Sequence, residues 1–219
     1  MAADQRIPFQ VSDHNEDTPF RIAVFASGGG SNFQAIIDRV RSGELDVKLE
    51  LLVSDKPKCK AVERAQEAGI DTYTFHPREY ASREAYEREI VAEMQRRGID
   101  LVVMAGFMRL VTNELVQPYY GRMINIHPAL LPAFKGAHGI ADALAAGVKV
   151  TGATVHYVSL EMDAGPIIGQ QTVEVHEDDT EETLAARIHD VEHELLPRVI
   201  RWISEGCVRI EGSRTVVNK

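Results

Sequence analysis

Hydrophobic and polar positions follow two patterns that take turns along the chain. Short apolar runs rich in branched side chains are separated by longer segments in which apolar residues recur every three or four positions. The runs are typical of buried parallel strands, and the spaced segments are typical of amphipathic helices. The patterns predict strands at residues 21–26, 47–53, 72–75, 100–105, 122–127, 150–158, 166–175 and 208–210, and helices at residues 32–41, 58–68, 83–97, 138–146 and from 180 onward.

Strands and helices that alternate in this way predict an α/β fold, which we expect to be a doubly wound, mostly parallel, Rossmann-like sheet. Pro166 and the alternating polarity after it indicate an antiparallel C-terminal excursion near a sheet edge. A long C-terminal helix follows, and Pro197 should kink it or start a new helix. The pattern fits one domain at residues 21–210, flanked by polar tails at residues 1–20 and 211–219.

The composition narrows the class of protein. The 219 residues include 24 Lys and Arg against 33 Asp and Glu, a net charge of −9, which disfavours a nucleic-acid binder. No apolar run is long enough to span a membrane, and the N-terminus lacks the features of a signal peptide. Cys59 and Cys207 lack metal-ligand spacing, so we expect no metal, and two free thiols in a reducing, cytoplasmic compartment.

A run of three glycines lies at the first junction between strand and helix, Ser27-Gly-Gly-Gly-Ser31. Such a junction directs backbone N–H groups and the positive end of the helix toward one point, which is a site for phosphate. A tight turn is the simpler interpretation. A dinucleotide-binding interpretation is also open. Asp55 could meet a ribose, although the bulky Phe33 stands at the third position of that fingerprint.

Asn125 and His127 end the fifth expected strand, and Pro128 then stops the ladder. Residues two apart in a strand face the same side, so the amide and the imidazole should point together. Asp163 follows the next strand, and its carboxylate could orient the His127 ring and stabilise its cation. The ordinary alternatives are a hydrogen-bonded structural histidine and a turn aspartate. Because no Ser or Cys nucleophile lies beside them, the residues suit direct attack by a substrate amine, with His127 as acid and Asn125 as oxyanion donor.

A second apolar stretch, residues 106–111, follows the fourth strand. Apolar side chains and an Arg at the carboxyl end of a central strand suit a flat, partly aromatic ligand with anionic groups. Burial in the core is the ordinary interpretation for Phe107, Met108 and Leu110. Arg83 lies in the first turn of a helix, where a cation opposes the helix dipole. It is either a solvated surface residue or a contact to an anionic ligand.

Six motifs follow one another along the chain: SGGGSN, SREAYE, AGFMRLV, NIHPALLPAFKG, GATVHYV and MDAGPII. Together they resemble the folate-dependent formyltransferases, and among these the glycinamide ribonucleotide transformylases. The resemblance extends from Arg21 to about Ile210. Formyltetrahydrofolate deformylases and methionyl-tRNA formyltransferases share the fold. The former add an N-terminal domain and have a second His at the position of Pro128, and the latter lack the glycine loop.

The resemblance implies transfer of a formyl group from 10-formyltetrahydrofolate, the co-substrate, to the amine of glycinamide ribonucleotide, a step of de novo purine synthesis. It implies a ribonucleotide-binding half at residues 21–105 and a folate-binding and catalytic half at residues 106–210, and it is compatible with a homodimer. Catalytic roles are implied for Asn125, His127 and Asp163. Ribonucleotide contacts are implied for Gly30, Ser31, Asn32, His189, Asp190, Val191 and Glu192, and folate contacts for Arg83, Met108, Arg109, Leu110, Val111, Asn125, Ser159, Leu160, Glu161, Met162 and Asp163.

Four positions depart from the family pattern. Lys135 replaces a usual Pro, and Ala129, Met162 and Ala164 replace Ser, Leu and Gly. None of them belongs to the catalytic trio. Two other functions stay open from the sequence: hydrolysis of the same formyl donor, with water in place of the amine, and an NAD(P)-dependent dehydrogenase or a non-catalytic nucleotide sensor.

Overall fold

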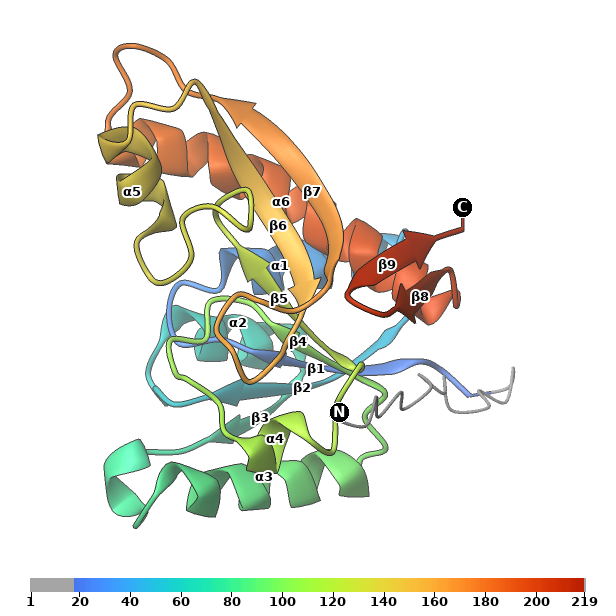
Figure 1. The fold of residues 1–219 in the computed structure, drawn as a ribbon. Helices are drawn as coiled ribbons and strands as arrows, with labels where there is room; N and C mark the ends of the chain where they lie inside the picture. Colours follow the sequence, from blue (N-terminus) through green and yellow to red (C-terminus); the bar gives the residue numbers. More distant parts are fainter. Residues whose placement is uncertain (1–17, 219) are drawn as a thin grey trace, which may run out of the picture.

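A computed structural model describes residues 18–218, which contain an open sheet of seven strands (Figure 1). Its strands are β1 (Arg21–Phe25), β2 (Lys48–Ser54), β3 (Asp71–Thr74), β4 (Leu101–Met104), β5 (Met123–His127), β6 (Val150–Tyr157) and β7 (Ile167–Glu174). The strand order is β3-β2-β1-β4-β5-β6-β7. The strands from β3 to β5 are parallel, β6 is antiparallel to β5, and β7 is antiparallel to β6. The expected fold class is therefore confirmed.

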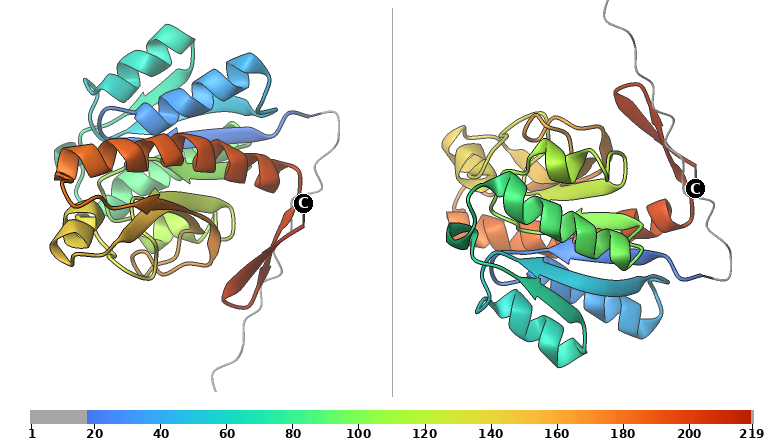
Figure 2. Two further views of the ribbon diagram at one scale, coloured as in Figure 1. Left: turned by 90° about the horizontal axis from the view of Figure 1, so that it is seen from above. Right: turned by 90° about the horizontal axis from the view of Figure 1, so that it is seen from below.

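Helices cover both faces of this sheet (Figure 2). They are α1 (Ser31–Ser42), α2 (Lys60–Ala68), α3 (Arg83–Arg96), α4 (Asn113–Val116), α5 (Gly139–Ala145) and α6 (Glu181–Ser204), with a 3₁₀ turn η1 (Pro77–Glu79). Alternate residues of β1 belong to the hydrophobic cores on opposite faces of the sheet. Ile22 and Val24 pack with α1, α2 and α6, whereas Ala23 and Phe25 pack with α3 and α4. Because both faces are buried, the central strands are almost continuously apolar.

The C-terminal part differs from the expected pattern in two places. α6 is a single helix through Pro197, so the proline does not start a new helix; buried Leu195 and Val199 hold the helix against the sheet on both sides of it. Residues 211–219, expected as a polar tail, include β9 (Arg214–Val217), which forms a hairpin with β8 (Val208–Glu211). β9 is too short to show a clear alternation in sequence.

Two further expectations concern segments that are short or only partly described. α4 has four residues, too few to give a helical period, and the sequence pattern missed it. Most of the expected N-terminal tail, residues 1–17, lies outside the described residues. Within residues 18–218, no helix has both the length and the apolarity to cross a membrane.

The two sides of β5 have different surroundings. Ile124 and Ile126 face the core that α1 and α6 cover. Asn125 and His127 point to the opposite face, as their spacing predicts. Figure 1 shows α6 behind β6 and β7, and the connection between these two strands in front of the sheet. Loops, together with Gly139 at the start of α5, therefore cover the polar side of β5.

Candidate active site

Four polar side chains meet on the loop-covered face of β5 and β6. Asn125 pairs with His156 across the two strands, and His127 pairs with Thr154, so all four point to one side of the sheet. His127 is 4% exposed, His156 is 2% exposed and Thr154 is fully buried. Polar groups this deeply buried need hydrogen-bond partners, and those partners define the site.

Thr154 fixes the segment that follows β5. Its Oγ1 donates to the carbonyl of Ala129 (2.7 Å) and accepts the N–H of Leu131 (3.1 Å). The segment then brings the carbonyl of Phe134 to His127, whose Nε2 donates to it at 2.8 Å. Because a carbonyl only accepts, Nε2 of His127 carries a proton. Nδ1 is therefore the ring nitrogen of His127 that can exchange a proton with a substrate.

Asp163 reaches this cluster from the loop between β6 and β7. Its Oδ2 accepts the N–H of Gly136 at 2.8 Å and lies 3.6 Å from Nδ1 of His127. Its Oδ1 lies 3.6 Å from Nε2 of His156. Burial pushes the pKa of the Asp163 carboxyl up, but the groups around it, among them the Gly136 N–H and His127, outweigh burial and hold that pKa below its ordinary value. Asp163 is therefore an ionised carboxylate that faces two imidazoles.

The glycine loop between β1 and α1 turns its carbonyls to one side. The carbonyl of Gly28 accepts the N–H of Ala61 at 3.1 Å, and that of Gly29 accepts Nε of Arg64 at 2.9 Å. In a trans peptide the following N–H points the opposite way, away from α2. Gly30 has φ 68°, and a Cβ there would lie 2.8 Å from the Cβ of Ala61. With the unpaired N–H groups of the first turn of α1, the loop is built to hold an anion.

Side chains of α1 and α6 are joined next to this loop. Asn32 Nδ2 donates to Oε2 of Glu192 at 3.0 Å, and Nδ1 of His189 donates to the same oxygen at 2.9 Å. Glu192 is 3% exposed, and its hydrogen bond raises the pKa of the His189 imidazole. Val191 packs against the core, and Asp190 is exposed. Of the expected α6 residues, Glu192 is thus joined to α1 through Asn32, and His189 contacts Glu192 from within α6.

Asp55 anchors the stretch after β4. Its carboxylate accepts Oγ of Ser27 at 2.5 Å and Nε of Arg109 at 2.7 Å, and the N–H of Met108 donates to Oγ of Ser27 at 3.0 Å. Asp55 is 5% exposed, and both of its oxygens are occupied. Asp55 therefore does not present a free carboxylate to a ribose, and the dinucleotide-binding interpretation lacks the acidic residue that would bind one.

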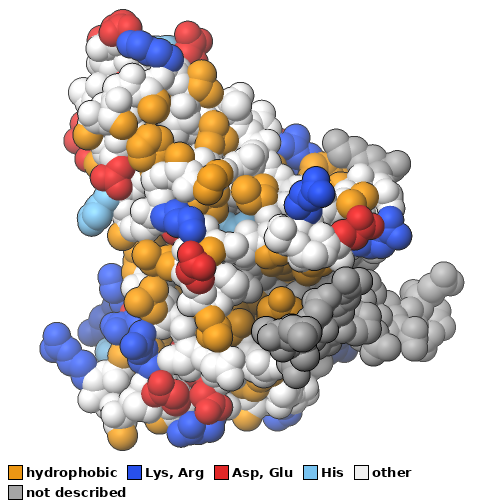
Figure 3. Space-filling model, in the orientation of Figure 1, with side chains coloured by type: hydrophobic (Ala, Val, Ile, Leu, Met, Phe, Trp, Pro, Cys, Tyr) orange, Lys and Arg blue, Asp and Glu red, His pale blue; other side chains and the backbone are white. Residues whose placement is uncertain are grey.

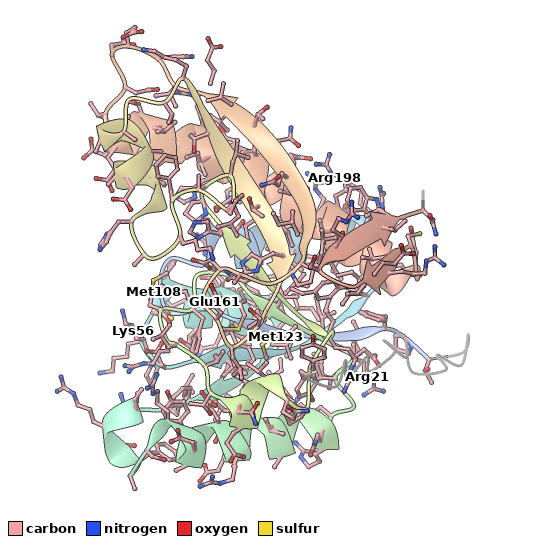
Figure 4. All side chains as sticks on the ribbon, viewed as in Figure 1. Arg21, Lys56, Met108, Met123, Glu161 and Arg198 are labelled. Atoms are coloured by element: carbon pink, nitrogen blue, oxygen red, sulfur yellow. The ribbon has the colours of Figure 1, made fainter. Side chains whose placement is uncertain are left out.

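Two loops expose apolar side chains near the polar cluster. Met108 and Leu110, after β4, are 70% and 60% exposed, and Leu160 and Met162, after β6, are 64% and 51% exposed. The ordinary interpretation of Met108 and Leu110 as core residues is therefore wrong. Figure 3 shows hydrophobic side chains across the middle of this face, and Figure 4 labels Met108 on the first of these loops and Glu161 on the second. Exposed apolar side chains on neighbouring loops are typical of a ligand site.

Other residues of the stretch after β4 are fixed by contacts with the core and with α3. Phe107 packs edge-on against Phe25, with ring centroids 5.3 Å apart and planes at 87°, so for Phe107 the core interpretation is right. Val111 packs against the core that α3 covers. Nη1 of Arg83 donates to the carbonyl of Leu110 at 3.4 Å. Arg83 therefore lies beside this stretch with its side chain at the surface.

The loop after β6 is tied by two contacts of Glu161. Its carbonyl accepts Oγ of Ser159 at 2.8 Å, and its carboxylate accepts Nζ of Lys135 at 3.3 Å. Lys135 is one of the departures from the family pattern. In this structure it links the segment after β5 to the loop that carries Asp163.

Sequence reasoning missed two residues that belong to the site region. His156 lies between Asn125 and Asp163, and its position on the same face as Thr154 is readable from the alternation in β6. Glu87, 1% exposed, accepts both the N–H (3.0 Å) and Oγ1 (2.5 Å) of Thr112. No sequence signal marks Glu87, because it sits on an ordinary helix, α3.

The chain is similar to known proteins over the region that carries the site. The family model described as formyl transferase matches residues 20–200. The chain is 47% identical over 183 residues to a phosphoribosylglycinamide formyltransferase of Bacillus subtilis (strain 168), covering 84% of this chain and 94% of that protein. It is 41% identical over 189 residues to a phosphoribosylglycinamide formyltransferase of Escherichia coli (strain K12), covering 86% of this chain and 89% of that protein.

A solved structure agrees in fold. The glycinamide ribonucleotide transformylase 1 of Symbiobacterium toebii superposes with a TM-score of 0.90 at 42% identity, covering 92% of this chain and 95% of that one. The family match spans the glycine loop, the stretch after β4 and the cluster on β5 and β6.

Proposed function

The chain belongs to the formyl transferase family, and on that premise we propose that it transfers a formyl group from 10-formyltetrahydrofolate to the amine of glycinamide ribonucleotide. The observation that carries the proposal is the meeting of Asn125, His127 and Asp163, which come from two separate segments. The names of the similar proteins support the same reaction.

The proposed reaction is a direct attack. The substrate amine adds to the formyl carbon, and a tetrahedral intermediate with a negatively charged oxygen forms. The described residues offer no Ser or Cys nucleophile paired with the His127 imidazole, so a covalent enzyme intermediate is not required. Collapse of the intermediate breaks the bond between the formyl carbon and the folate nitrogen. The proton that the attacking amine loses ends on that nitrogen, so the formylated amine and tetrahydrofolate are released.

Asn125 and His127 supply the hydrogen bonds to that oxygen. One N–H of the Asn125 amide is engaged by His156, at 3.2 Å, and the second is free to donate. Nε2–H of His127 is held by Phe134, so the proton on Nδ1 is the one that reaches the oxyanion. Asp163 stabilises the doubly protonated His127 imidazolium before it gives up this proton, from 3.6 Å, a gap that can tighten when substrate binds.

The ribonucleotide is proposed to bind with its phosphate on the glycine loop. The N–H groups of Gly30, Ser31 and Asn32 lie at the start of α1, where the helix dipole favours an anion. Glu192, an acceptor fixed by Asn32 and His189, suits the hydroxyl groups of a ribose.

The folate is proposed to bind between the stretch after β4 and the loop after β6. Its pterin ring suits the exposed side chains of Met108, Leu110 and Met162. Arg83 lies at the outer end of this region and suits a folate carboxylate. The mechanism uses no metal ion.

We also propose a cytoplasmic location, which the free thiols Cys59 and Cys207 support. A homodimer is compatible with this mechanism, because all of the proposed catalytic groups come from one chain. Sedimentation of the purified protein tests the dimer.

Product analysis tests the function. The enzyme is incubated with 10-formyltetrahydrofolate and glycinamide ribonucleotide, and the products are identified by mass spectrometry. We expect the ribonucleotide to gain one formyl group and the folate to lose it in equal amounts. Free formate without formylated ribonucleotide would instead identify a hydrolase, and no change in either compound would overturn the proposal.

A further inference from the structure

No proton or bond of the proposed reaction passes through His156, yet His156 contacts two of the three catalytic residues. Its Nε2 lies 3.2 Å from Nδ2 of Asn125 and 3.6 Å from Oδ1 of Asp163. We propose that His156 is a positioning residue: as a neutral imidazole protonated on Nδ1, it accepts a hydrogen bond from Asn125 and so aims the second N–H of that amide at the formyl oxygen. The inference rests on the proposed function.

The backbone of β6 fixes the tautomer of His156. Its Nδ1 lies 2.8 Å from the carbonyl of Tyr157, the next residue. A carbonyl can only accept, so the ring proton sits on Nδ1 and Nε2 keeps its lone pair. The amide of Asn125 must then present its nitrogen, not its oxygen, to Nε2. One contact therefore decides which end of the Asn125 side chain is a donor toward the site.

The number of charges in the cluster favours a neutral His156. Asp163 is the carboxylate that faces both imidazoles, at 3.6 Å each. The single negative charge of Asp163 neutralises one imidazolium, and in the proposed mechanism the imidazolium is His127. A second imidazolium at a position only 2% exposed would leave an uncompensated buried charge, which is costly. It would also replace the acceptor that Asn125 needs with a donor.

Amide orientation matters because the two ends of the Asn125 side chain have opposite effects on an oxyanion. The N–H donates to it, whereas the carbonyl oxygen repels it. Without an acceptor at Nε2 of His156, the amide can rotate and present either end. Oxyanion holes work through donors that are oriented before the charge develops, so this freedom lowers the rate of the chemical step and leaves substrate affinity almost unchanged.

Two substitutions separate positioning from simple packing. His156→Gln places a carbonyl oxygen close to the position of Nε2 and keeps an acceptor, whereas His156→Leu has a similar volume and no acceptor. Both lose the hydrogen bond to the Tyr157 carbonyl, so that loss cancels in the comparison. We expect His156→Gln to retain kcat within about tenfold, and His156→Leu to lose up to the roughly 10²–10³-fold that removal of an oxyanion donor costs. KM for both substrates should stay within about threefold, since neither substrate contacts His156 in the ground state.

A double-mutant cycle completes the test. In an Asn125→Ala background there is no amide to orient, so His156→Leu should lower kcat no further. Equal losses in the Gln and Leu variants, or an undiminished loss in the Asn125→Ala background, would overturn the proposal. Imidazole nitrogen chemical shifts of the wild-type enzyme, measured by NMR, should show His156 as the Nδ1–H tautomer; the Nε2–H form or a cation would equally overturn it. The wild-type product assay and this NMR readout keep failure of the proposed function distinguishable from failure of the inference.

Discussion

Asp163 shows how one residue can be constrained by backbone and charge together. Its φ is 52°, in the left-handed region that Asp and Asn tolerate better than most side chains. That turn directs the carboxylate back into the cluster, where it accepts the N–H of Gly136 and faces His127 and His156. A loop aspartate without these contacts would be an ordinary turn residue.

The first prediction concerns the substitution of Asp163 by asparagine, which has the same shape and no charge. Asp163→Asn keeps the backbone preference and the acceptor for Gly136 but removes the charge that stabilises the His127 cation. We expect kcat to fall by about 10²–10⁴-fold, by analogy with the orienting aspartate of a serine-protease triad. The thermal unfolding midpoint serves as the control and should change little. A variant with near-normal kcat would remove Asp163 from the mechanism.

The alternation of side chains along β5 and β6 organises the site at the level of elements. Ile124, Ile126 and Val155 fill the core on one face, while Asn125, His127 and His156 face the loops on the other. The strand pairing then brings Asn125 opposite His156, and the β6–β7 connection returns Asp163 to the same point. Each polar side chain is placed by a strand or by a strand-bounded loop, which limits its freedom.

Much of this arrangement is predictable from sequence, and the rest fails for physical reasons. The apolar runs predict the strands of the sheet, and the shared face of Asn125 and His127 follows from their spacing. The pairing of Asn125 with His156 depends on the register of two strands, which a single sequence does not specify. The exposure of Met108 and the helix through Pro197 are decided by tertiary packing, which overrides local preference.

The glycine loop gives a prediction at this scale. A Cβ at Gly30 would meet the Cβ and Cα of Ala61 at 2.8 Å and 2.9 Å, and φ 68° is strained for Ala. We expect Gly30→Ala to lower the free energy of unfolding by roughly 1–3 kcal/mol and to raise KM for the ribonucleotide. Gly29→Ala is the matched control for folding, because a Cβ there meets no atom within 4 Å. Equal stability of the two variants in chemical denaturation would contradict the packing argument.

The hydrogen bond between His189 and Glu192, both on α6, should depend on pH. The hydrogen bond that His189 donates to Glu192 raises the pKa of the His189 imidazole above its ordinary value of 6.5. Its contribution to stability is therefore complete below that pH and is lost as the pH rises through the raised pKa. We expect the difference in melting temperature between wild type and His189→Gln to be largest below pH 6.5 and to shrink at higher pH. A difference that stays constant or grows with pH would exclude this pairing.

Across the whole molecule, the site is assembled from segments far apart in sequence. The glycine loop follows β1, the apolar stretch follows β4, the amide and imidazole end β5, and the carboxylate follows β6. These junctions lie around the crossover of an open sheet, where such folds bind ligands. The β8–β9 hairpin adds a wall: Arg214 and Thr215 border a hollow of about 460 Å³ that reaches Asp163.

The overall charge makes local donors necessary. The chain carries a net charge of −9, and both proposed substrates are anions. Long-range attraction therefore does not draw them in, and we propose that binding relies on the N-terminus of α1 at Gly30 and on Arg83 and Arg109.

Single-turnover formyl transfer with enzyme in excess over substrate tests the central proposal most directly, because it isolates the chemical step from binding and product release. The formylated ribonucleotide is quantified by mass spectrometry for the wild type and for Asn125→Ala. We expect the wild type to convert the ribonucleotide completely and Asn125→Ala to react about 10²–10³-fold more slowly, since it lacks one oxyanion donor. A folded Asn125→Ala enzyme with the wild-type rate constant would contradict the mechanism.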